Sequence, residues 1–359
     1  MLIQGDCKWT GAVFALVCDD NLNYAANALA LELTTKVDVE VHVFIETKSN
    51  INYVIQCITH PRIVYHHNVL FRNINSEVYD NPRFSRAAWG RIMLPTILGV
   101  YKRIIYCDID VLPGKLEPHI LGIDLPNGIA LVRDESDILS SRNKLPDNHA
   151  RFRTGDKYFN SGFMIIDPNN WDIPDVNANL TKFFTSGDAS FAPYVDQDFL
   201  NVHFANRIVE LSPLYNLHYN FMRLGTIKPD RVAIRHFTVE EKPYYKTSDI
   251  SSRHHVDRGR ELYQEILLKA GVDIDDIPER STNKSRILKS IIRNNLFRVK
   301  LKTKKTRALF KTWEIEQNLF SQYLHEGADG VFCDNFNKND IIKNQIPNFD
   351  GFEFYLPFL

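Results

Sequence analysis

The chain is predicted to be an α/β protein with a mainly parallel central sheet flanked by helices. Over the first 250 residues, short apolar runs typical of buried strands alternate with stretches of helical spacing. Hydrophobic residues make up 44% of the 359, which is enough for a large core. Two Asp-rich turns follow directly on strand-like runs. In such sheets ligands bind beyond the carboxyl ends of the strands, so these turns mark the expected site.

The elements can be justified in order along the chain. Apolar runs, or alternation with period two, predict strands at 12–17, 39–45, 63–65, 103–107, 129–132, 163–166 and 232–234. Apolar residues at helical spacing predict helices at 24–33, 85–101, 196–204 and 258–270. The sequence GVDIDDIP at 271–278 is an acidic turn that closes this part of the chain.

The C-terminal part of the chain separates its charges. Between 280 and 311 there are 12 Lys and Arg residues and no Asp or Glu, and apolar residues recur at helical spacing over 287–296. This pattern predicts an amphipathic helix with a cationic face. Such a helix is a solvated face, a contact with an anionic membrane surface, or a segment docked on the acidic body. The tail, 312–359, is acidic and rich in aromatic residues.

These shifts in composition divide the chain into three predicted parts. Residues 1–250 form the main α/β domain with a Rossmann-like sheet, which is the part expected to carry the site, and 251–279 form a helical connector. Residues 280–359 comprise the basic amphipathic segment and the aromatic-rich acidic tail, which together make a helical, basic C-terminal extension.

Composition also excludes several classes of protein. With 43 Lys and Arg against 44 Asp and Glu, the chain lacks the basic excess of a general nucleic-acid binder, so no nucleic-acid partner is expected. Five widely spaced cysteines without a C-x-x-C pair argue against a disulfide framework or zinc ribbon and favour a reducing compartment. The N-terminus resembles neither a signal peptide nor an anchor, and no apolar run approaches roughly 18 residues. A cytoplasmic location is therefore expected.

The sequence Asp108-Ile109-Asp110 is the sharpest chemical feature. Residues two apart in an extended strand project to the same face, so both carboxylates are expected to converge on one point. A hard divalent cation binds oxygen ligands of this kind and can neutralise a diphosphate. An ordinary turn is the alternative, and for an isolated D-x-D it is the commoner outcome.

Three further motifs support a site. The sequence KYFNSGFMIID at 157–167 contains a small-residue break before a buried strand, where Asn160 could bind a sugar hydroxyl; an ordinary loop is the alternative. In VDQDFL at 195–200, two carboxylates flank an amide at a helix start, although this pattern also suits an N-cap. His236, straight after a strand, could be a third metal ligand, and Lys242 could meet a phosphate. A lone His is more often structural.

Taken in order, these motifs resemble glycosyltransferase family 8. The set comprises an Asp-Asp loop followed by Asn and Tyr, an Arg in the next helical region, D-I-D, Y-F-N-S-G, D-Q-D and H-F-x-x-x-x-K-P, over about residues 12–250. The family contains retaining enzymes of the GT-A fold, among them bacterial lipopolysaccharide galactosyl- and glucosyltransferases and glycogenin. The resemblance therefore implies a GT-A fold with a UDP-sugar as donor.

The resemblance also implies roles for individual positions. It makes Asp108, Asp110 and His236 the ligands of Mn²⁺ or Mg²⁺, and Gln197 the amide nearest the anomeric carbon. The implied donor-binding residues are Asp19 and Asn21 at the uridine, Tyr24 at the base, Arg91 at the nucleotide sugar, Asp108 at the metal, Asn160 and Asp196 around the donor sugar, and Lys242 at the diphosphate. One departure is Val239, where the family often has Gly.

The implied reaction is transfer of a hexose, galactose or glucose, with retention at the anomeric carbon. The expected acceptor is a glycan or glycolipid of the lipopolysaccharide or lipooligosaccharide type. In a front-face reaction Gln197 would stabilise an oxocarbenium-like centre, whereas Asp196 is the nearest carboxylate for a covalent route. The alternatives are a glycogenin-like self-glucosylating enzyme and a nucleotide-sugar-binding protein without turnover. The segment 280–311 is a candidate for peripheral contact with the inner face of the cytoplasmic membrane.

Overall fold

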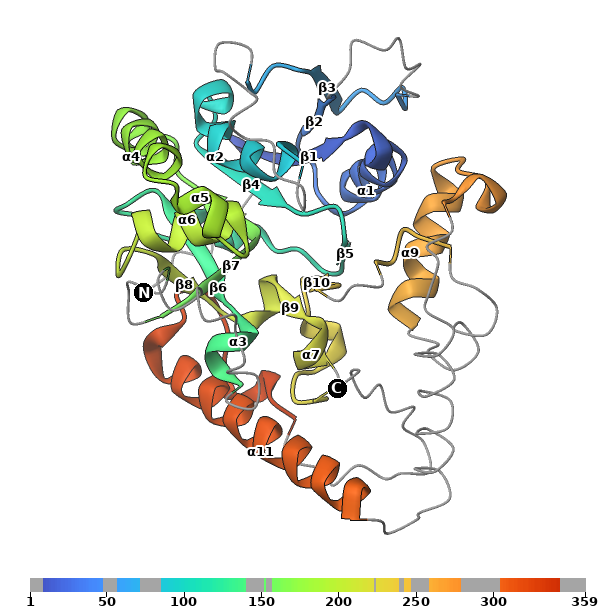
Figure 1. Ribbon diagram of the computed structural model, residues 1–359. Coiled ribbons are helices and arrows are strands. Elements are labelled where there is room, and N and C mark those ends of the chain that lie inside the picture. Colours follow the sequence, from blue (N-terminus) through green and yellow to red (C-terminus); the bar gives the residue numbers. More distant parts are fainter. Residues whose placement is uncertain are drawn as a thin grey trace.

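A seven-stranded sheet forms the centre of the computed structural model, which describes residues 9–47, 57–71, 85–139, 152, 157–222, 224–238, 242–246, 258–278 and 304–342. In spatial order its strands are β3 (Ile63–His67), β2 (Val41–Glu46), β1 (Ala12–Asp19), β4 (Arg103–Cys107), β7 (Phe159–Ile166), β6 (Ile129–Arg133) and β8 (Val209–Leu211). Four of the neighbouring pairs are parallel, which confirms the predicted mainly parallel sheet (Figure 1).

Strand β7 is the exception, because it runs antiparallel to both β4 and β6. Its first residues therefore lie at the edge where the parallel strands end. The predicted small-residue break at 160–162 is wrong, since these residues belong to β7 and are buried. The pairing register of β6 with β7 shifts between Leu131 and Val132, which accommodates the irregular start of the strand.

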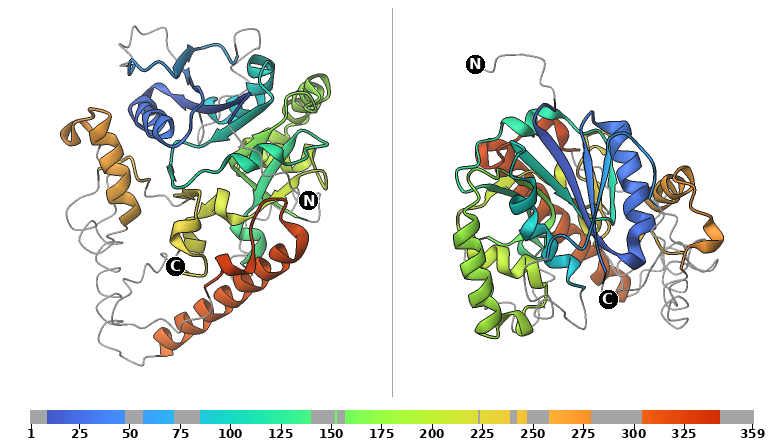
Figure 2. Two further views of the ribbon diagram at one scale, coloured as in Figure 1. Left: turned by 180° about the vertical axis from the view of Figure 1, so that it is seen from behind. Right: turned by 90° about the horizontal axis from the view of Figure 1, so that it is seen from above.

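Helices cover both faces of this sheet (Figure 2). On one face lies α1 (Asn23–Lys36), whose buried alanines and leucines pack in one hydrophobic cluster. The opposite face is covered by α2 (Ala87–Leu98), α4 (Ile173–Thr185) and α6 (Val195–His203), which share a second cluster. The helices predicted at 24–33, 85–101 and 196–204 are confirmed with shifts of a few residues at their ends.

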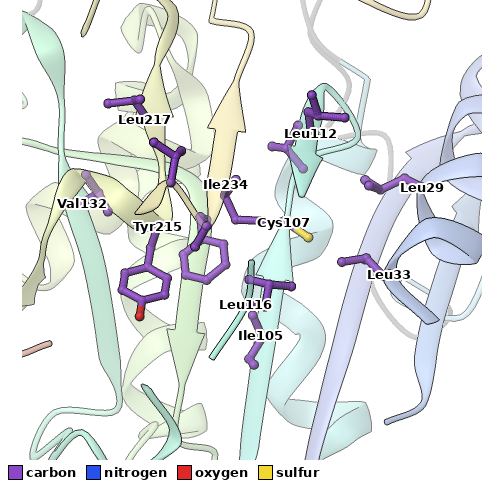
Figure 3. Close-up of a cluster of buried hydrophobic side chains, with 14 of the residues drawn as sticks. Leu29, Leu33, Ile105, Cys107, Leu112, Leu116, Val132, Tyr215, Leu217 and Ile234 are labelled. Atoms are coloured by element: carbon purple, nitrogen blue, oxygen red, sulfur yellow. The ribbon is translucent and has the colours of Figure 1, made fainter. Parts of the chain in front are cut away.

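A second, three-stranded sheet brings a distant segment beside the end of β4. Its central strand β10 (Ile234–His236) pairs antiparallel with β5 (Val111–Pro113) and parallel with β9 (Leu217–His218). Side chains of this sheet join those of β4 in the first hydrophobic cluster (Figure 3): Ile105, Cys107, Leu112, Leu217 and Ile234. The strand predicted at 232–234 therefore begins later and includes His236, which was expected just after it.

The C-terminal helices pack on the same body. The helix α9 (Arg258–Lys269), predicted at 258–270, lies beside α1 (Figure 2). The longer α11 (Lys304–Glu326) buries Phe320, Tyr323 and Leu324 in the first hydrophobic cluster. The basic helix predicted over 287–296 and the last residues of the tail lie outside the described residues. None of the helices in the described ranges is both long and apolar enough to cross a membrane.

Candidate active site

Polar residues gather at the edge where the parallel strands end. Asp19 is the last residue of β1, Asp108 follows β4, and Asp134 follows β6. Asn160 lies near the start of β7, which reaches the same edge because it runs in the opposite direction. The fold therefore assembles from separate segments the kind of strand-end site that the sequence predicts.

The D-I-D sequence is a turn between β4 and β5, so the expected extended strand is wrong, yet its two carboxylates do converge. One ligand atom from each of Asp108, Asp110 and His236 lies within 4.8 Å of the others. The Nε2 atom of His236 is 3.3 Å from Asp110 Oδ1 and 3.8 Å from Asp108 Oδ2. Two carboxylates and an imidazole are a suitable donor set for Mn²⁺ or Mg²⁺, so these residues fit the implied cation.

Asn216 orients the His236 ring. Its Oδ1 atom is 2.8 Å from His236 Nδ1, while its amide nitrogen donates to Asn160 Oδ1 at 2.9 Å. The amide orientation therefore directs His236 Nδ1 to the Asn216 oxygen, and Nε2 is the ring nitrogen that faces the two carboxylates. Gly162 makes room for the ring, since a Cβ there would lie 2.2 Å from His236 Cε1. Asn216 belongs to no motif recognised in the sequence.

Lys242 reaches the same group from the segment after β10. Its Nζ lies 2.5 Å from Asp110 Oδ2 and donates to the carbonyl of Phe237 at 3.0 Å. Burial opposes ionisation of Asp110, but the Lys242 ammonium and the His236 ring outweigh it and hold its pKa below the ordinary value. Lys242 thus lies beside Asp108, Asp110 and His236, the candidate metal-ligand group. Val239 lies outside the described residues.

Arg91 links the metal-ligand group to the D-Q-D sequence. Its guanidinium is buried, with Nη2 2.9 Å from Asp108 Oδ1 and Nε 3.1 Å from Asp196 Oδ2. It also donates to the carbonyl and the hydroxyl of Ser161, both at 2.8 Å. Burial raises the pKa of Asp196 to about 6, even though Arg91 acts in the opposite direction. Two carboxylates thereby compensate the buried cation.

Gln197 and Asn160 belong to one hydrogen-bond network. The Oε1 atom of Gln197 accepts from the Ser161 N–H at 3.1 Å, and its amide nitrogen donates to the Tyr158 hydroxyl at 3.2 Å. Both amides also donate to Asp134 Oδ2, from Asn160 at 3.1 Å and from Gln197 at 3.4 Å. Asp134 was missed in the sequence, although it directly follows β6 as Asp108 directly follows β4.

The two carboxylates of the D-Q-D sequence have different partners. Asp196 pairs with Arg91, whereas Asp198 accepts from the Tyr194 N–H at 2.8 Å and from the Tyr158 hydroxyl at 2.7 Å. The N-cap residue of α6 is Tyr194, so the N-cap alternative is wrong for both carboxylates. Asp198 instead holds the Tyr194 N–H from the first turn of the helix, and Asp196 is directed to Arg91. Val195, the first residue of α6, directly precedes Asp196 and has a φ of 34°. This conformation is rare for a β-branched residue and marks local strain at the start of the helix.

The residues expected at the nucleotide lie around the end of β1. Asn21 is exposed in a short 3-10 turn (Asp20–Leu22), and the buried Oδ1 of Asp19 has no hydrogen-bond partner within the described ranges. Burial raises the pKa of Asp19. The Tyr24 hydroxyl donates to the carbonyl of Tyr244 at 2.8 Å, which ties α1 to the segment that carries Lys242.

His218 is a further histidine that sequence reasoning missed. It lies on β9 opposite His236, fully buried, and the two rings are 5.8 Å apart in an edge-to-face arrangement. Burial lowers the pKa of His218 to about 4, with the nearby His236 adding to the effect. His218 is therefore a neutral ring that packs edge-to-face against the candidate ligand His236, and no local sequence pattern predicts it.

A mainly parallel sheet with Asp108 at the end of β4, next to Asp110 and the His236 imidazole of the smaller sheet, is the architecture of a GT-A glycosyltransferase. The chain belongs to glycosyl transferase family 8, whose model matches residues 14–248. Membership makes the protein a glycosyltransferase by class.

The solved structures that it resembles support the fold. The galactosyltransferase LgtC, solved with donor and acceptor sugar analogues, is 20% identical with a TM-score of 0.55, over 72% of this chain and 95% of that one. The bifunctional glycosyltransferase WbbM is 16% identical with a TM-score of 0.51, over 81% of this chain and 53% of WbbM.

A curated relative comes from Bacillus subtilis (strain 168). Its General stress protein A is 29% identical in an alignment of 194 positions that covers 48% of this chain and 64% of that protein. The chain therefore spans a little under two thirds of the length of this relative.

Proposed function

We propose that the protein is a retaining, metal-dependent hexosyltransferase that moves galactose or glucose from a UDP-sugar to a glycan acceptor of the lipopolysaccharide or lipooligosaccharide type. The convergence of Asp108, Asp110 and His236 within 4.8 Å carries this proposal. Similarity to LgtC, a galactosyltransferase solved with donor and acceptor sugar analogues, supports galactose as one donor to test.

The metal-ligand group would stabilise the leaving nucleotide. Asp108, Asp110 and His236 would hold Mn²⁺ or Mg²⁺, which when bound supplies positive charge for the departing diphosphate. Lys242, 2.5 Å from Asp110, would add a second positive charge on the same side. Stabilising charge that develops on the leaving group is a large electrostatic contribution to such a reaction.

The sugar side favours a front-face reaction with retention. Asp196 is fixed by Arg91 and by the Ser161 hydroxyl, which donates to it at 3.0 Å, so its carboxylate is committed to holding Arg91. Gln197 is held by Ser161 and Tyr158 and would stabilise positive charge at the anomeric carbon without attacking it. Asn160 and Asp134 would bind hydroxyls of the sugars.

A donor screen tests this function. Purified protein is incubated with UDP-galactose, UDP-glucose and other UDP-sugars, with and without Mn²⁺, and UDP release is measured. We expect metal-dependent release with one hexose, and loss of at least about 100-fold in Asp108→Ala and Asp110→Ala with the fold retained, because each removes a proposed ligand. Asp38→Ala, which removes an exposed carboxylate, is the control. Full activity of either ligand variant, or of the protein in EDTA, would contradict the metal assignment.

The same material separates the two alternatives. A glycogenin-like enzyme needs no added acceptor, so incubation with UDP-glucose alone would raise its mass in steps of one hexose. A nucleotide-sugar-binding protein without turnover would bind the donor and release no UDP, not even by slow hydrolysis with Mn²⁺. The ordered network around Gln197 favours turnover over binding alone.

We also propose that the basic segment 280–311 holds the enzyme on an anionic membrane surface, on the inner face of the cytoplasmic membrane. The support is its composition, 12 Lys and Arg residues with no Asp or Glu. Each basic residue near such a surface contributes about 1 kcal/mol of attraction. This location would bring the catalytic domain to a lipid-linked acceptor.

A further inference from the structure

Each residue of the D-I-D turn has a hydrogen bond that holds its backbone. The N–H of Asp108 donates to the carbonyl of Gly162 at 2.8 Å, and the N–H of Phe237 donates to the carbonyl of Asp110 at 3.0 Å. The carbonyl of Ile109 accepts from the Tyr263 hydroxyl at 2.5 Å. Two of these bonds are backbone pairs within the matched family region, whereas the third comes from a side chain of α9, beyond residue 248.

Tyr263 is well placed to act on this turn. It is fully buried, and α9 packs against α1 on the sheet face that carries the small sheet. Its ring centroid lies 6.4 Å from that of Tyr244, whose carbonyl accepts the Tyr24 hydroxyl. Tyr263 and Tyr244 therefore connect the turn with the Lys242 segment, and the Tyr24 hydrogen bond extends this connection to α1.

The Ile109 carbonyl belongs to the peptide unit that leads into Asp110, the second candidate metal ligand. A peptide unit is planar, so rotating the Ile109–Asp110 peptide would also turn the backbone that carries the Asp110 side chain. A donor bonded to that carbonyl restricts the rotation before a cation arrives. Ligands that are already oriented lose less conformational freedom when they bind, which increases affinity.

We propose that Tyr263 is a positioning residue for the metal site, and that α9 is part of the metal-binding machinery of this chain. Its hydroxyl holds the Ile109–Asp110 peptide so that the carboxylate of Asp110 faces His236. This role rests on the proposed metal-dependent function. It also gives α9 a role at the metal site, whereas the sequence predicts only a helical connector over 251–279.

Mn²⁺ binding without turnover tests the proposal. The electron paramagnetic resonance signal of free Mn²⁺ is titrated with full-length protein, with no donor present. Tyr263→Phe removes only the hydroxyl and is expected to weaken Mn²⁺ binding by about three- to tenfold. Tyr323→Phe is the matched control, because it removes a buried hydroxyl that donates to Glu210 Oε1 at 3.0 Å on α11 and β8. It is expected to bind Mn²⁺ as the unsubstituted protein does.

Melting temperatures measured without metal separate positioning from general stability. Similar small decreases in both variants, with weaker Mn²⁺ binding in Tyr263→Phe alone, support the proposal. Unchanged affinity in Tyr263→Phe, or an equal loss in both variants, overturns it. If the unsubstituted protein binds no Mn²⁺, the metal site of the proposed function fails, and this role of Tyr263 fails with it.

Discussion

Asp196 and Asp198 are two buried carboxylates, separated in the sequence by Gln197, that have different environments. Asp196 pairs with the Arg91 guanidinium, while Asp198 accepts hydrogen bonds from two neutral donors, the Tyr194 N–H and the Tyr158 hydroxyl. Burial raises the pKa of each to about 6. The presence of a charged partner thus distinguishes Asp196, which belongs to the candidate site, from Asp198, which holds the start of α6.

The raised pKa of Asp198 predicts a pH-dependent effect on stability. Its folded-state pKa of about 6 lies above its unfolded value, so the unfolded state ionises first and the contribution of Asp198 to stability falls as pH rises from about 4 to 7. The side chain of the Asp198→Asn variant cannot ionise in this range. Its amide oxygen can still accept from the Tyr194 N–H, and its amide nitrogen can donate to the Tyr158 hydroxyl oxygen. Between pH 4.5 and 8 the free energy of unfolding of the variant should therefore gain about 2 kcal/mol relative to wild type. Urea denaturation at the two pH values measures this, and a constant difference would contradict it.

At the scale of elements, β7 shows what local patterns miss. Asn160, Ser161 and Gly162 form a sequence typical of a loop, yet they are buried strand residues. They are held there by partners from elsewhere in the chain, among them Asp134, Arg91 and Asn216. A strand made of small polar residues is stable at this place because its neighbours satisfy its polar groups.

Gly162→Ala tests this close packing. An added Cβ would lie 2.2 Å from His236 Cε1, so the ring must move away from Asp108 and Asp110. We expect Mn²⁺-dependent UDP release to fall by about tenfold or more. Gly122→Ala, where the new methyl group would meet open space, is the matched control and should retain activity. Equal activities in the two variants, measured at saturating donor, would show that the ring tolerates the methyl group.

At the scale of the whole molecule, the net charge of −1 combines an acidic body, a basic segment and an acidic tail. The tail is joined to the body, because α11 buries Phe320, Tyr323 and Leu324 in the core and Gln317 donates to the carbonyl of Leu224 at 3.1 Å. Removing everything after residue 278 would therefore expose apolar surface. Substitution within the basic segment is the cleaner way to examine its role.

Charge neutralisation in this segment should reduce binding to anionic vesicles. Replacing Lys284, Arg286, Lys289 and Arg293 with Gln removes four charges, each worth about 1 kcal/mol near such a surface, so co-sedimentation should fall by at least about tenfold. The control replaces four exposed lysines of the body, Lys36, Lys102, Lys115 and Lys182. Equal binding by the two variants would show that the segment is an ordinary solvated face.

The sequence by itself determined the fold class, the family and most of the candidate site. Strand-like runs followed by Asp, and motifs such as D-I-D and D-Q-D, are local patterns that can be recognised without knowing which residues are in contact. Only the tertiary structure decided the reversed direction of β7, the support of His236 by Asn216, and the hydroxyl of Tyr263 on the D-I-D turn. Tyr263 is separated from Ile109 by 154 residues, and no local periodicity encodes a contact between segments that distant.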